Sequence, residues 1–464
     1  MHDSQQQHAL NAQTHTSIPL ALTPSLQDMA SSPTLAINEA VAARRAAGHT
    51  IIHLGFGEAS FPLHPLLGEA IARSAKRTGY APVAGIPSLR QAIAAYLHRT
   101  RHITFTPDNI VVAPGSKPLL YALLQVLDGD LLLPVPSWVS YAPQAQLAGR
   151  RVIAVETDAS DNQRLTSQAL SDAVARARFE GADPRILIVN TPSNPTGSMF
   201  SREGAQAIAN WSREHGITLI SDEIYAELAH GWREHISPAQ FYPEGCIVTG
   251  GLSKAFSAGG WRLGYAAIPD NAAGKQLVAS ARALASEIWS SAATPVQEAA
   301  VVAYSPNAEL TAYVQASARI HAYATARLYE TLTNLGALCP RPAGGFYLYP
   351  DLSPWREALL ARNIATSEQL AMHLLDQWDI ATLPGTAFCE QPQELRLRLA
   401  TSMLYMPPEA KTEEEREAAL WQLLAQAERW TDDGQANIVV KMPALKKAQV
   451  RLTEFIASLG QPIN

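Results

Sequence analysis

The chain has 464 residues, of which 47% are hydrophobic, and this is enough for a large core and for two or more domains. Its 36 basic and 42 acidic residues give a formal net charge of −6. The chain therefore lacks the excess of basic residues that is expected of proteins that bind nucleic acid or an anionic membrane surface. No apolar run approaches the length of a membrane span.

The N-terminal residues 1–18 are rich in Gln, His, Asn and Thr and show no periodicity, so we expect a disordered arm. This segment has neither the basic n-region nor the apolar h-region of a signal peptide.

From about residue 62 to residue 270, short apolar runs alternate with amphipathic patterns such as those at 88–99 and 201–216. Strands that are buried on both faces read as continuous apolar runs, so this alternation predicts an α/β domain with a mostly parallel sheet. The predicted strands are IVVAP (110–114), DLLLPV (130–135), RVIAVE (151–156), ILIVN (186–190), ITLISDE (217–223), CIVTGG (246–251) and GYAAIP (264–269).

Residues 307–336 form one long helical pattern, which we expect to bridge into a second domain. That domain is predicted to contain the strands GGFYLYPDL and ELRLRLATS and helices near 367–378 and 412–431. The tail from residue 443 on predicts a further amphipathic helix.

The three cysteines, Cys246, Cys339 and Cys389, are too few and too scattered for a disulfide framework or a CxxC zinc site. Reduced thiols in a cytoplasmic protein are the simplest interpretation. The thirteen histidines include no HExxH pair, so we predict no metal site. The chain also lacks a GxGxxG motif between strand and helix and a GxxxxGK[ST] motif, which argues against nicotinamide and nucleotide cofactors.

The segment GGLSKAFSAGGWRLGY (250–265) places Lys254 in a Gly/Ser-rich turn after a strand, with Arg262 eight residues later. A lysine beside a second cation can have a lowered amine pKa and attack an aldehyde. Ser253 and Arg262 offer a hydroxyl and a planar guanidinium, which suit a phosphate group. For Lys254 alone, a solvated loop lysine with a structural arginine nearby would be the favoured interpretation.

Further polar residues follow other strands, and such carboxyl-end positions line one crevice in an open α/β sheet. A turn of Gly115, Ser116 and Lys117 opens a helix, where free backbone N–H groups favour a phosphate. The other positions are Trp138, Asn194, Asp222 and Tyr225. Each has a structural alternative: a surface carboxylate for Asp222, ordinary core for the two aromatic residues, and turn chemistry for Asn194.

These motifs belong to a series of sequence blocks that, in their order along the chain, resemble the class I aminotransferases of pyridoxal-5′-phosphate (PLP) fold type I. The resemblance is to the bacterial aspartate-aminotransferase branch. The resemblance covers about residues 25 to 430. The matching blocks are ASSPTLAINEA, LGFGEASF, GYAPVAGIPSLRQAIA, GSKPLLYAL, PSWVSYAP, VNTPSNPTG, SDEIYAEL, SKAFSAGGWRLGY, RPAGGFYLYP, LPGTAF and LRLRLATS.

The resemblance implies a role for each candidate residue. Lys254 forms the Schiff base with PLP and moves the proton from the substrate, and Asp222 pairs with the pyridine nitrogen. Tyr225 and Asn194 hydrogen-bond the ring hydroxyl oxygen, and Trp138 stacks on the ring. The phosphate is held by Gly115, Ser116, Lys117, Ser253 and Arg262, with Tyr80 reaching it from the second subunit of a homodimer.

For the substrate, the resemblance implies that Arg396 clamps the α-carboxylate, helped by Asn194 and the Gly57 backbone. Arg398, two residues further, is on the same strand face, and one of the two arginines can serve a structural ion pair instead. Lys117 could meet a distal carboxylate or be a solvated first-turn residue, and Ser32 and Thr34 are placed to close over the substrate.

The sequence departs from the family pattern at three places, namely Ala59-Ser60 where Pro-Asp is usual, Arg398, and the tail beyond residue 434. These departures leave the substrate open. The expected function is the transfer of an amino group between an L-amino acid and a 2-oxo acid, with acidic substrates such as aspartate, glutamate or 2-oxoglutarate. The alternatives are another PLP reaction on this fold (a lyase, a cyclising synthase or an oxidase) and a non-catalytic effector-sensing module, which would need a DNA-binding domain.

The resemblance also implies the domain organisation. We expect a large PLP-binding domain with a mostly parallel seven-stranded sheet between helices, and a smaller α+β domain. The predicted bounds are 1–18 for the arm, 19–61 for the N-terminal segment of the small domain, 62–335 for the large domain, 336–434 for the C-terminal small domain and 435–464 for an extra helical tail.

Overall fold

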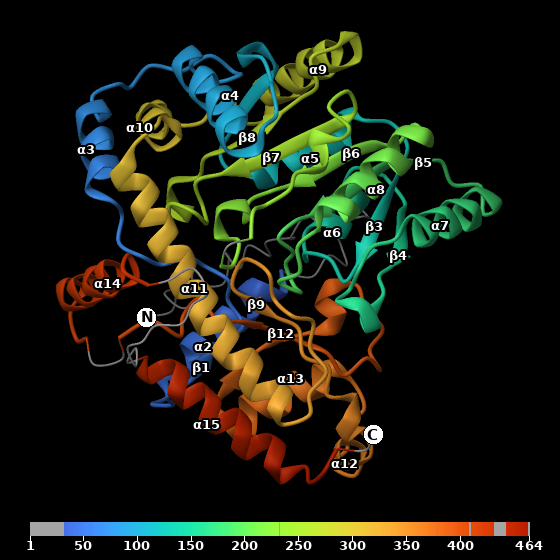
Figure 1. Ribbon diagram of the computed structural model, residues 1–464, viewed down its shortest axis with the longest axis vertical. Coiled ribbons are helices and arrows are strands. Elements are labelled where there is room, and N and C mark those ends of the chain that lie inside the picture. The colour runs from blue at the N-terminus through green and yellow to red at the C-terminus, as the bar shows by residue number, and fades with distance from the viewer. Residues whose placement is uncertain (1–31, 232, 408–409, 431–441, 463–464) are drawn as a thin grey trace, which may run out of the picture. The chain divides into compact units, whose positions relative to one another are not determined.

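The computed structural model describes residues 32–231, 233–407, 410–430 and 442–462 (Figure 1). The predicted disordered arm at 1–18 lies outside these residues. The described residues all belong to one compact unit.

A seven-stranded sheet forms the centre of the fold, in the order β2-β8-β7-β6-β5-β3-β4. Strand β8 runs antiparallel to both of its neighbours, and the other neighbouring pairs are parallel. All seven strands predicted from apolar runs are confirmed, and so is the mostly parallel sheet. The strands are β2 (Ile110–Ala113), β3 (Asp130–Val135), β4 (Val152–Glu156), β5 (Pro184–Asn190), β6 (Thr218–Asp222), β7 (Cys246–Gly251) and β8 (Gly264–Ala267).

Helices cover both faces of this sheet, which explains why its strands are apolar throughout. In β5, Ile186 and Ile188 join the apolar cluster on one face, whereas Leu187 and Val189 join the cluster on the other. The first face is covered by α5 (Ser116–Val126), α6 (Tyr141–Leu147) and α9 (Ala272–Ile288). The second face is covered by α4 (Pro87–Arg101), α7 (Ser167–Phe179) and α8 (Arg202–Glu214).

The long helix predicted at 307–336 is α11 (Ala308–Asn334), and the Asn307 side chain caps its first turn by accepting a hydrogen bond from Leu310 N. In Figure 1, α11 runs from the neighbourhood of α3 (Pro65–Ser74) and α10 (Thr294–Tyr304) towards a second group of strands. It therefore links the two groups of elements.

The second group of strands is small. Strands β11 (Leu383–Pro384), β12 (Leu397–Ala400) and β9 (Tyr347–Leu348) form an antiparallel sheet in that order, and β1 (Ile52–His53) pairs in parallel with β10 (Ile380–Ala381). The surrounding helices are α2 (Pro33–Ala46), α12 (Arg356–Leu360), α13 (Ser367–Trp378), α14 (Glu413–Ala427) and α15 (Pro443–Ser458). Short 3₁₀ helices are η1 (Pro107–Asn109), η2 (Ala159–Asp161), η3 (Ala226–Leu228), η4 (Pro238–Gln240), η5 (Gly259–Trp261), η6 (Ser353–Trp355) and η7 (Gly385–Phe388).

The helix predicted from residue 443 on is α15. Its buried face includes Leu452 and Phe455, and Gln449 donates a hydrogen bond of 2.8 Å to the Thr331 hydroxyl of α11. The division into domains at the bounds given above stays a prediction.

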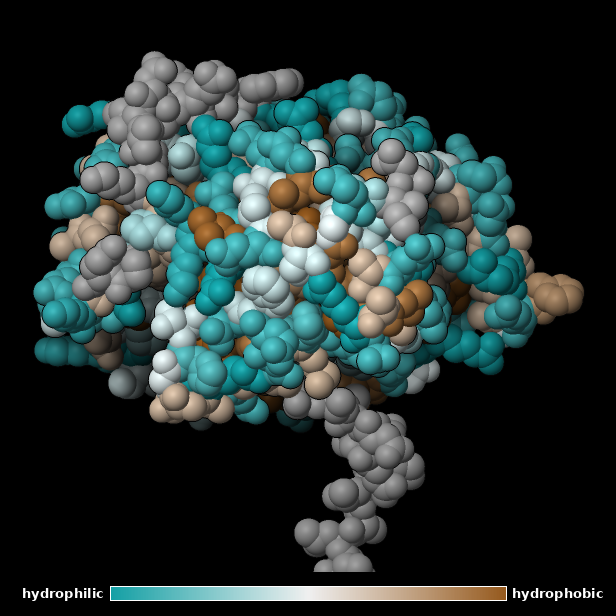
Figure 2. All heavy atoms as spheres, turned by 90° about the horizontal axis from the view of Figure 1, so that it is seen from below, coloured by the Kyte–Doolittle hydropathy of each residue, from teal (hydrophilic) through white to brown (hydrophobic). Residues whose placement is uncertain are grey.

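The surface seen from below in Figure 2 is mostly hydrophilic, and its apolar side chains form small separate groups. In the part of the chain that the structure describes, no helix is both long and apolar enough to cross a membrane.

Candidate active site

A cavity of about 340 Å³ lies at the carboxyl ends of the central strands. The loops after β3, β5, β6 and β7 reach it, together with residues before and after β1 and residues of β9 and β12. Most of the residues predicted for the site line this cavity. They are Gly57, Ser116, Lys117, Trp138, Asn194, Asp222, Tyr225, Ser253, Lys254 and Arg262.

Lys254 follows β7, and its amine points into the cavity. The Nζ atom donates a hydrogen bond of 2.7 Å to the Gly57 carbonyl oxygen. It also lies 5.8 Å from the ring centroid of Tyr225 and 5.7 Å from that of Phe346. Aromatic rings on two sides and a carbonyl on a third hold the amine in one place.

Burial lowers the pKa of Lys254 to about 8, because a charged amine loses its hydration there. Glu58 opposes this shift, whereas the positive charges of Arg398, Arg262 and Lys117 add to it. Roughly a tenth of the amine is then neutral at pH 7, whereas almost none of an ordinary lysine is. A neutral amine is what attack on an aldehyde requires.

Asp222 ends β6 and is buried at the side of the cavity. Its carboxylate accepts hydrogen bonds from the Tyr141 hydroxyl at 2.8 Å and the Thr249 hydroxyl at 3.2 Å. Burial raises the pKa of Asp222 to about 6, although these two hydrogen bonds oppose the shift. No cation among the described residues pairs with this carboxylate, so a positively charged ring nitrogen could take that place.

Tyr225 and Asn194 lie close to Asp222 around the same cavity. The hydroxyl of Tyr225 shares a hydrogen bond of 2.8 Å with that of Tyr347. The Asn194 backbone N–H donates to Asn190 Oδ1 at 2.7 Å, which fixes the loop after β5. The Tyr225 hydroxyl and the backbone of the Asn194 loop therefore have defined positions before any ligand binds.

Trp138 forms one wall of the cavity. Its ring lies edge-on to Tyr141, with 5.1 Å between the ring centroids. The Nζ atom of Lys117 lies 5.0 Å from the Trp138 ring centroid. Lys117 is exposed to solvent at the mouth of the cavity, and partial loss of hydration together with the charge of Arg262 lowers its pKa.

The N-terminus of α5 and the Arg262 guanidinium together form a cationic cradle. Gly115 adopts φ 98°, which L side chains rarely adopt, and an added Cβ would also displace the Arg262 guanidinium, so glycine suits this turn. Arg262 Nη1 donates to the Gly259 carbonyl at 2.7 Å. The free N–H groups of the first turn, with Ser116 and Ser253 on the cavity wall, make an anion site.

The structure does not bring Arg396 to this cavity, so the prediction for this residue is wrong. Arg396 Nε pairs with Asp351 at 3.1 Å, Nη1 with Glu390 at 2.7 Å and Nη2 with Glu394 at 3.4 Å. Burial opposes its charge, but these carboxylates raise its pKa above the ordinary value. Three carboxylates compensate the charge of this guanidinium and hold it outside the cavity, so it is not placed to bind a substrate there.

Arg398 occupies the cavity instead. It is buried in β12, and its guanidinium lies 5.0 Å from the ring centroid of Tyr347. It donates to the Gly55 carbonyl and to Asn194 Oδ1, and its buried Nε has no hydrogen-bond partner among the described residues. Burial lowers the pKa of Arg398. A buried arginine without a carboxylate partner is a ready site for an added carboxylate.

The sequence analysis did not assign roles to Tyr141 and Tyr347, which the structure places beside Asp222 and Tyr225. The alternation in FYLY puts Tyr347 on the same face as Tyr349, which bonds Glu390 instead, so the pattern does not single out Tyr347. Tyr141 follows Trp138 by three residues, but nothing in that spacing indicates a contact with Asp222. Among the described residues, no group of three or more His, Cys, Asp or Glu could hold a metal ion.

A buried lysine with a lowered pKa, a buried carboxylate and an anion cradle, all at the carboxyl edge of a parallel sheet, define an enzyme for small anionic molecules. The chain belongs to the family of class I and II aminotransferases, whose sequence model matches residues 49–404. It is an aminotransferase of fold type I, as the sequence predicts, and this family implies PLP as the cofactor.

Relatives of known name agree with this assignment. The chain is 34% identical over 395 residues to the aspartate aminotransferase of Geobacillus stearothermophilus, covering 83% of this chain and 95% of that protein. It is also 34% identical over 388 residues to the aspartate/prephenate aminotransferase of Thermus thermophilus, covering 82% and 94%. Among solved structures, the Thermus thermophilus aspartate aminotransferase with maleate has a TM-score of 0.74 at 31% identity, covering 88% and 100%.

Proposed function

We propose that the protein binds PLP in this cavity and transfers the amino group of an acidic L-amino acid, such as aspartate or glutamate, to a 2-oxo acid. The observation that carries the proposal is one cavity in which three buried groups meet: a lysine, a carboxylate and an arginine. Within the described part of the chain, the carboxylate has no cationic partner and the arginine has no carboxylate partner.

The residues present fit the cofactor. The cradle of Gly115, Ser116, Ser253 and Arg262 suits its phosphate, and Asp222 suits its ring nitrogen. When bound, PLP supplies an aldehyde that condenses with amines and a ring that accepts electrons from the bond broken at the substrate Cα. Trp138 covers one side of the space for the ring.

The residues that line the cavity have separate tasks in the proposed reaction. With PLP bound, Lys254 Nζ would be the group that takes the proton from the substrate Cα and holds it for return to the opposite end of the same transfer. Asp222, buried and negatively charged near neutral pH, keeps the ring nitrogen protonated. Tyr225 and Asn194 hold the ring hydroxyl oxygen, and Tyr347 fixes the direction of the Tyr225 hydroxyl.

Arg398 takes the role in substrate binding that the sequence analysis gave to Arg396. Its guanidinium can donate two parallel hydrogen bonds to the α-carboxylate, and Asn194 lies beside it. The Gly57 carbonyl faces the same space. Burial strengthens the attraction between the two charges, because the protein interior screens it less than water does.

Besides Arg398, Lys117 is a second cation at the cavity, and its charge favours substrates with a second carboxylate. Lys117 also lines the cavity, and no carboxylate among the described residues pairs with its amine. Ser32 and Thr34 line the same cavity and can close over the substrate. A distal carboxylate would gain about 1.5–3 kcal/mol from the ammonium group.

The substrate proposal is tested with Lys117→Met. We expect kcat/KM to fall about tenfold to a hundredfold for aspartate and to stay unchanged for alanine. An equal loss for both donors would mean that Lys117 serves the cofactor or the fold, and the proposal of acidic substrates would then fail.

We further propose a homodimer in which Tyr80 reaches the phosphate in the neighbouring subunit. Its side chain is 94% exposed in the single chain, which is unusual for a tyrosine and is expected of one that a second subunit covers. Sedimentation of an active monomer would contradict this proposal.

A further inference from the structure

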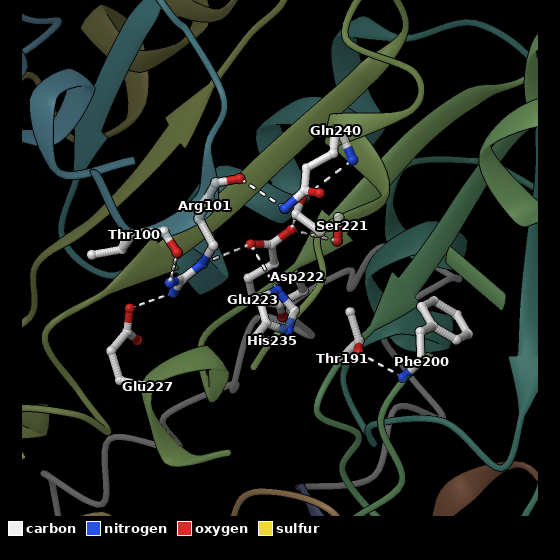
Figure 3. A network of polar contacts seen from close by, with 12 residues as sticks. Thr100, Arg101, Thr191, Phe200, Ser221, Asp222, Glu223, Glu227, His235 and Gln240 are labelled. Atoms are coloured by element: carbon white, nitrogen blue, oxygen red, sulfur yellow. Dashed lines mark hydrogen bonds and ion pairs between the residues drawn. The ribbon is translucent and has the colours of Figure 1, made fainter. Parts of the chain in front are cut away.

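A buried ionic cluster lies on the far side of the turn that carries Asp222 and Tyr225. We call it the Arg101 cluster, and it consists of Arg101, Glu223, Glu227, Tyr96 and His235. Figure 3 shows Arg101 between the two glutamates, with His235 beside Glu223 and Asp222 adjacent in the chain. The family motif quoted from the sequence, SDEIYAEL, contains both glutamates, but the site described above uses neither.

Arg101, the last residue of α4, joins the two glutamates. Its Nε atom contacts Glu223 Oε2 at 3.3 Å, and its Nη2 atom pairs with Glu227 Oε1. The remaining Nη1 donates to the Thr100 carbonyl at 3.2 Å. The side chains of Arg101 and Glu223 are only 6% and 1% exposed, so this bridge lies out of water.

Each glutamate has further fixed partners. Glu223 also accepts hydrogen bonds from the hydroxyls of Ser221, at 3.0 Å, and Ser237, and His235 Nε2 lies 3.1 Å from its Oε2. Glu227 also accepts a hydrogen bond from the Tyr96 hydroxyl. Both carboxylates are thus tied to elements outside the turn.

The bridge spans the segment that holds the cofactor residues. Glu223 and Glu227 are four residues apart, Tyr225 lies midway between them, and Asp222 comes directly before. Backbone hydrogen bonds continue the frame, from Glu223 N to the Thr249 carbonyl at 2.9 Å and from Ala226 N to the Glu223 carbonyl at 3.0 Å. A guanidinium that holds both ends of a five-residue segment fixes the direction of the side chain in its middle.

Stability alone is a poor reason for such a cluster. Apolar side chains of similar volume often stabilise a core as well as a buried ion pair does, because burying charges costs hydration. A planar guanidinium with two partners instead specifies geometry, which a catalytic site needs within about half an ångström.

We propose that Arg101 is a positioning residue, which clamps the segment from Glu223 to Glu227 so that Asp222 and Tyr225 meet the cofactor ring in one fixed arrangement. This inference rests on the proposed binding of PLP. It predicts that the bridge matters for cofactor binding and for the environment of the ring, beyond its effect on folding.

The decisive variant is Arg101→Lys, which keeps the charge but cannot span both carboxylates. We expect about tenfold weaker binding of PLP to the apoprotein, as is typical when an outer partner of a ligand residue is lost. We also expect faster cofactor release and a shifted midpoint in the pH titration of the bound cofactor's absorbance. Glu227→Gln is a milder change that removes one carboxylate of the bridge. It should weaken PLP binding, speed cofactor release and shift the titration midpoint in the same direction, and it replaces Arg101→Lys as the test if that variant does not fold.

The matched control is Arg90→Met, which removes another largely buried arginine of α4 that contacts Pro107 and Asp108 instead. It should leave PLP affinity and the titration midpoint as in the wild type. If Arg101→Lys or Glu227→Gln lowers the thermal stability of the apoprotein but binds PLP with unchanged affinity and spectrum, the cluster is structural and the inference is wrong. A wild-type protein that does not bind PLP would overturn the proposed function instead.

Discussion

Replacing Arg398 with methionine should remove the group that we propose for the substrate α-carboxylate, while a side chain of similar length still fills the buried site. Separating a buried guanidinium from its carboxylate typically costs about 3–5 kcal/mol. At about 1.4 kcal/mol for each factor of ten, kcat/KM for L-aspartate should fall by about 10²–10⁴.

The assay compares two substrates in the same variant. For 3-aminopropanoate, which is aspartate without the α-carboxylate, wild-type and Arg398→Met enzymes should have nearly equal kcat/KM values. For L-aspartate they should differ by the full factor. The difference between the two substrates isolates the contact with the α-carboxylate from any general damage to the site.

Arg396→Met is the matched control, because it removes the neighbouring arginine from its three carboxylates. This variant should unfold at a lower temperature, because Asp351 and Glu390 lose their cation, and should keep its discrimination between the two substrates. Arg398→Met should keep or raise the free energy of unfolding of the apoprotein, because it removes a buried charge that no carboxylate of the described segments compensates. A loss of discrimination in Arg396→Met but not in Arg398→Met would refute this reasoning.

Three further predictions concern Lys254 and Asp222. Borohydride reduction of the PLP-loaded enzyme, followed by peptide mapping, should find the pyridoxyl group on Lys254, and label on another lysine would exclude this assignment. In the apoprotein the pKa of Lys254 is lowered from 10.5 to about 8, so between these pH values the unfolded state binds one more proton than the folded state. The free energy of unfolding should therefore rise by about 2–3 kcal/mol from pH 8 to pH 10.5, relative to Lys254→Met. If urea unfolding shows the same pH dependence for both proteins, the pKa of Lys254 is not lowered. Asp222→Ala should retain the cofactor and lose most of its kcat, because an unprotonated ring accepts electrons poorly, and a near-normal kcat would make Asp222 a bystander.

The central sheet could be predicted from the sequence because its strands are buried on both faces. Ile186 to Val189 pack alternately against helices on two sides, so the run has to be apolar at each position. That many of the candidate residues would line one cavity was also predictable, since they follow strands whose carboxyl ends share one edge. Local pattern and tertiary position agree at these residues.

The two arginines of LRLRLA show where such reasoning stops. The alternation of side chains along a strand puts Arg396 and Arg398 on the same face, so the pattern alone cannot rank them. Arg396 is held by Asp351, which is 45 residues away in sequence and adjacent only after folding. The Arg101 cluster was missed for the same reason, because Arg101 and Glu223 are 122 residues apart.

The most direct test of the whole account is a single half-reaction with L-aspartate alone. The PLP-loaded enzyme is mixed with L-aspartate without any 2-oxo acid, and the cofactor and the product are both quantified. The account predicts one equivalent of oxaloacetate per site, with the amino group retained on the cofactor as pyridoxamine phosphate. Release of carbon dioxide or ammonia with the cofactor still in its aldehyde form would show a different reaction on this fold and contradict the assignment.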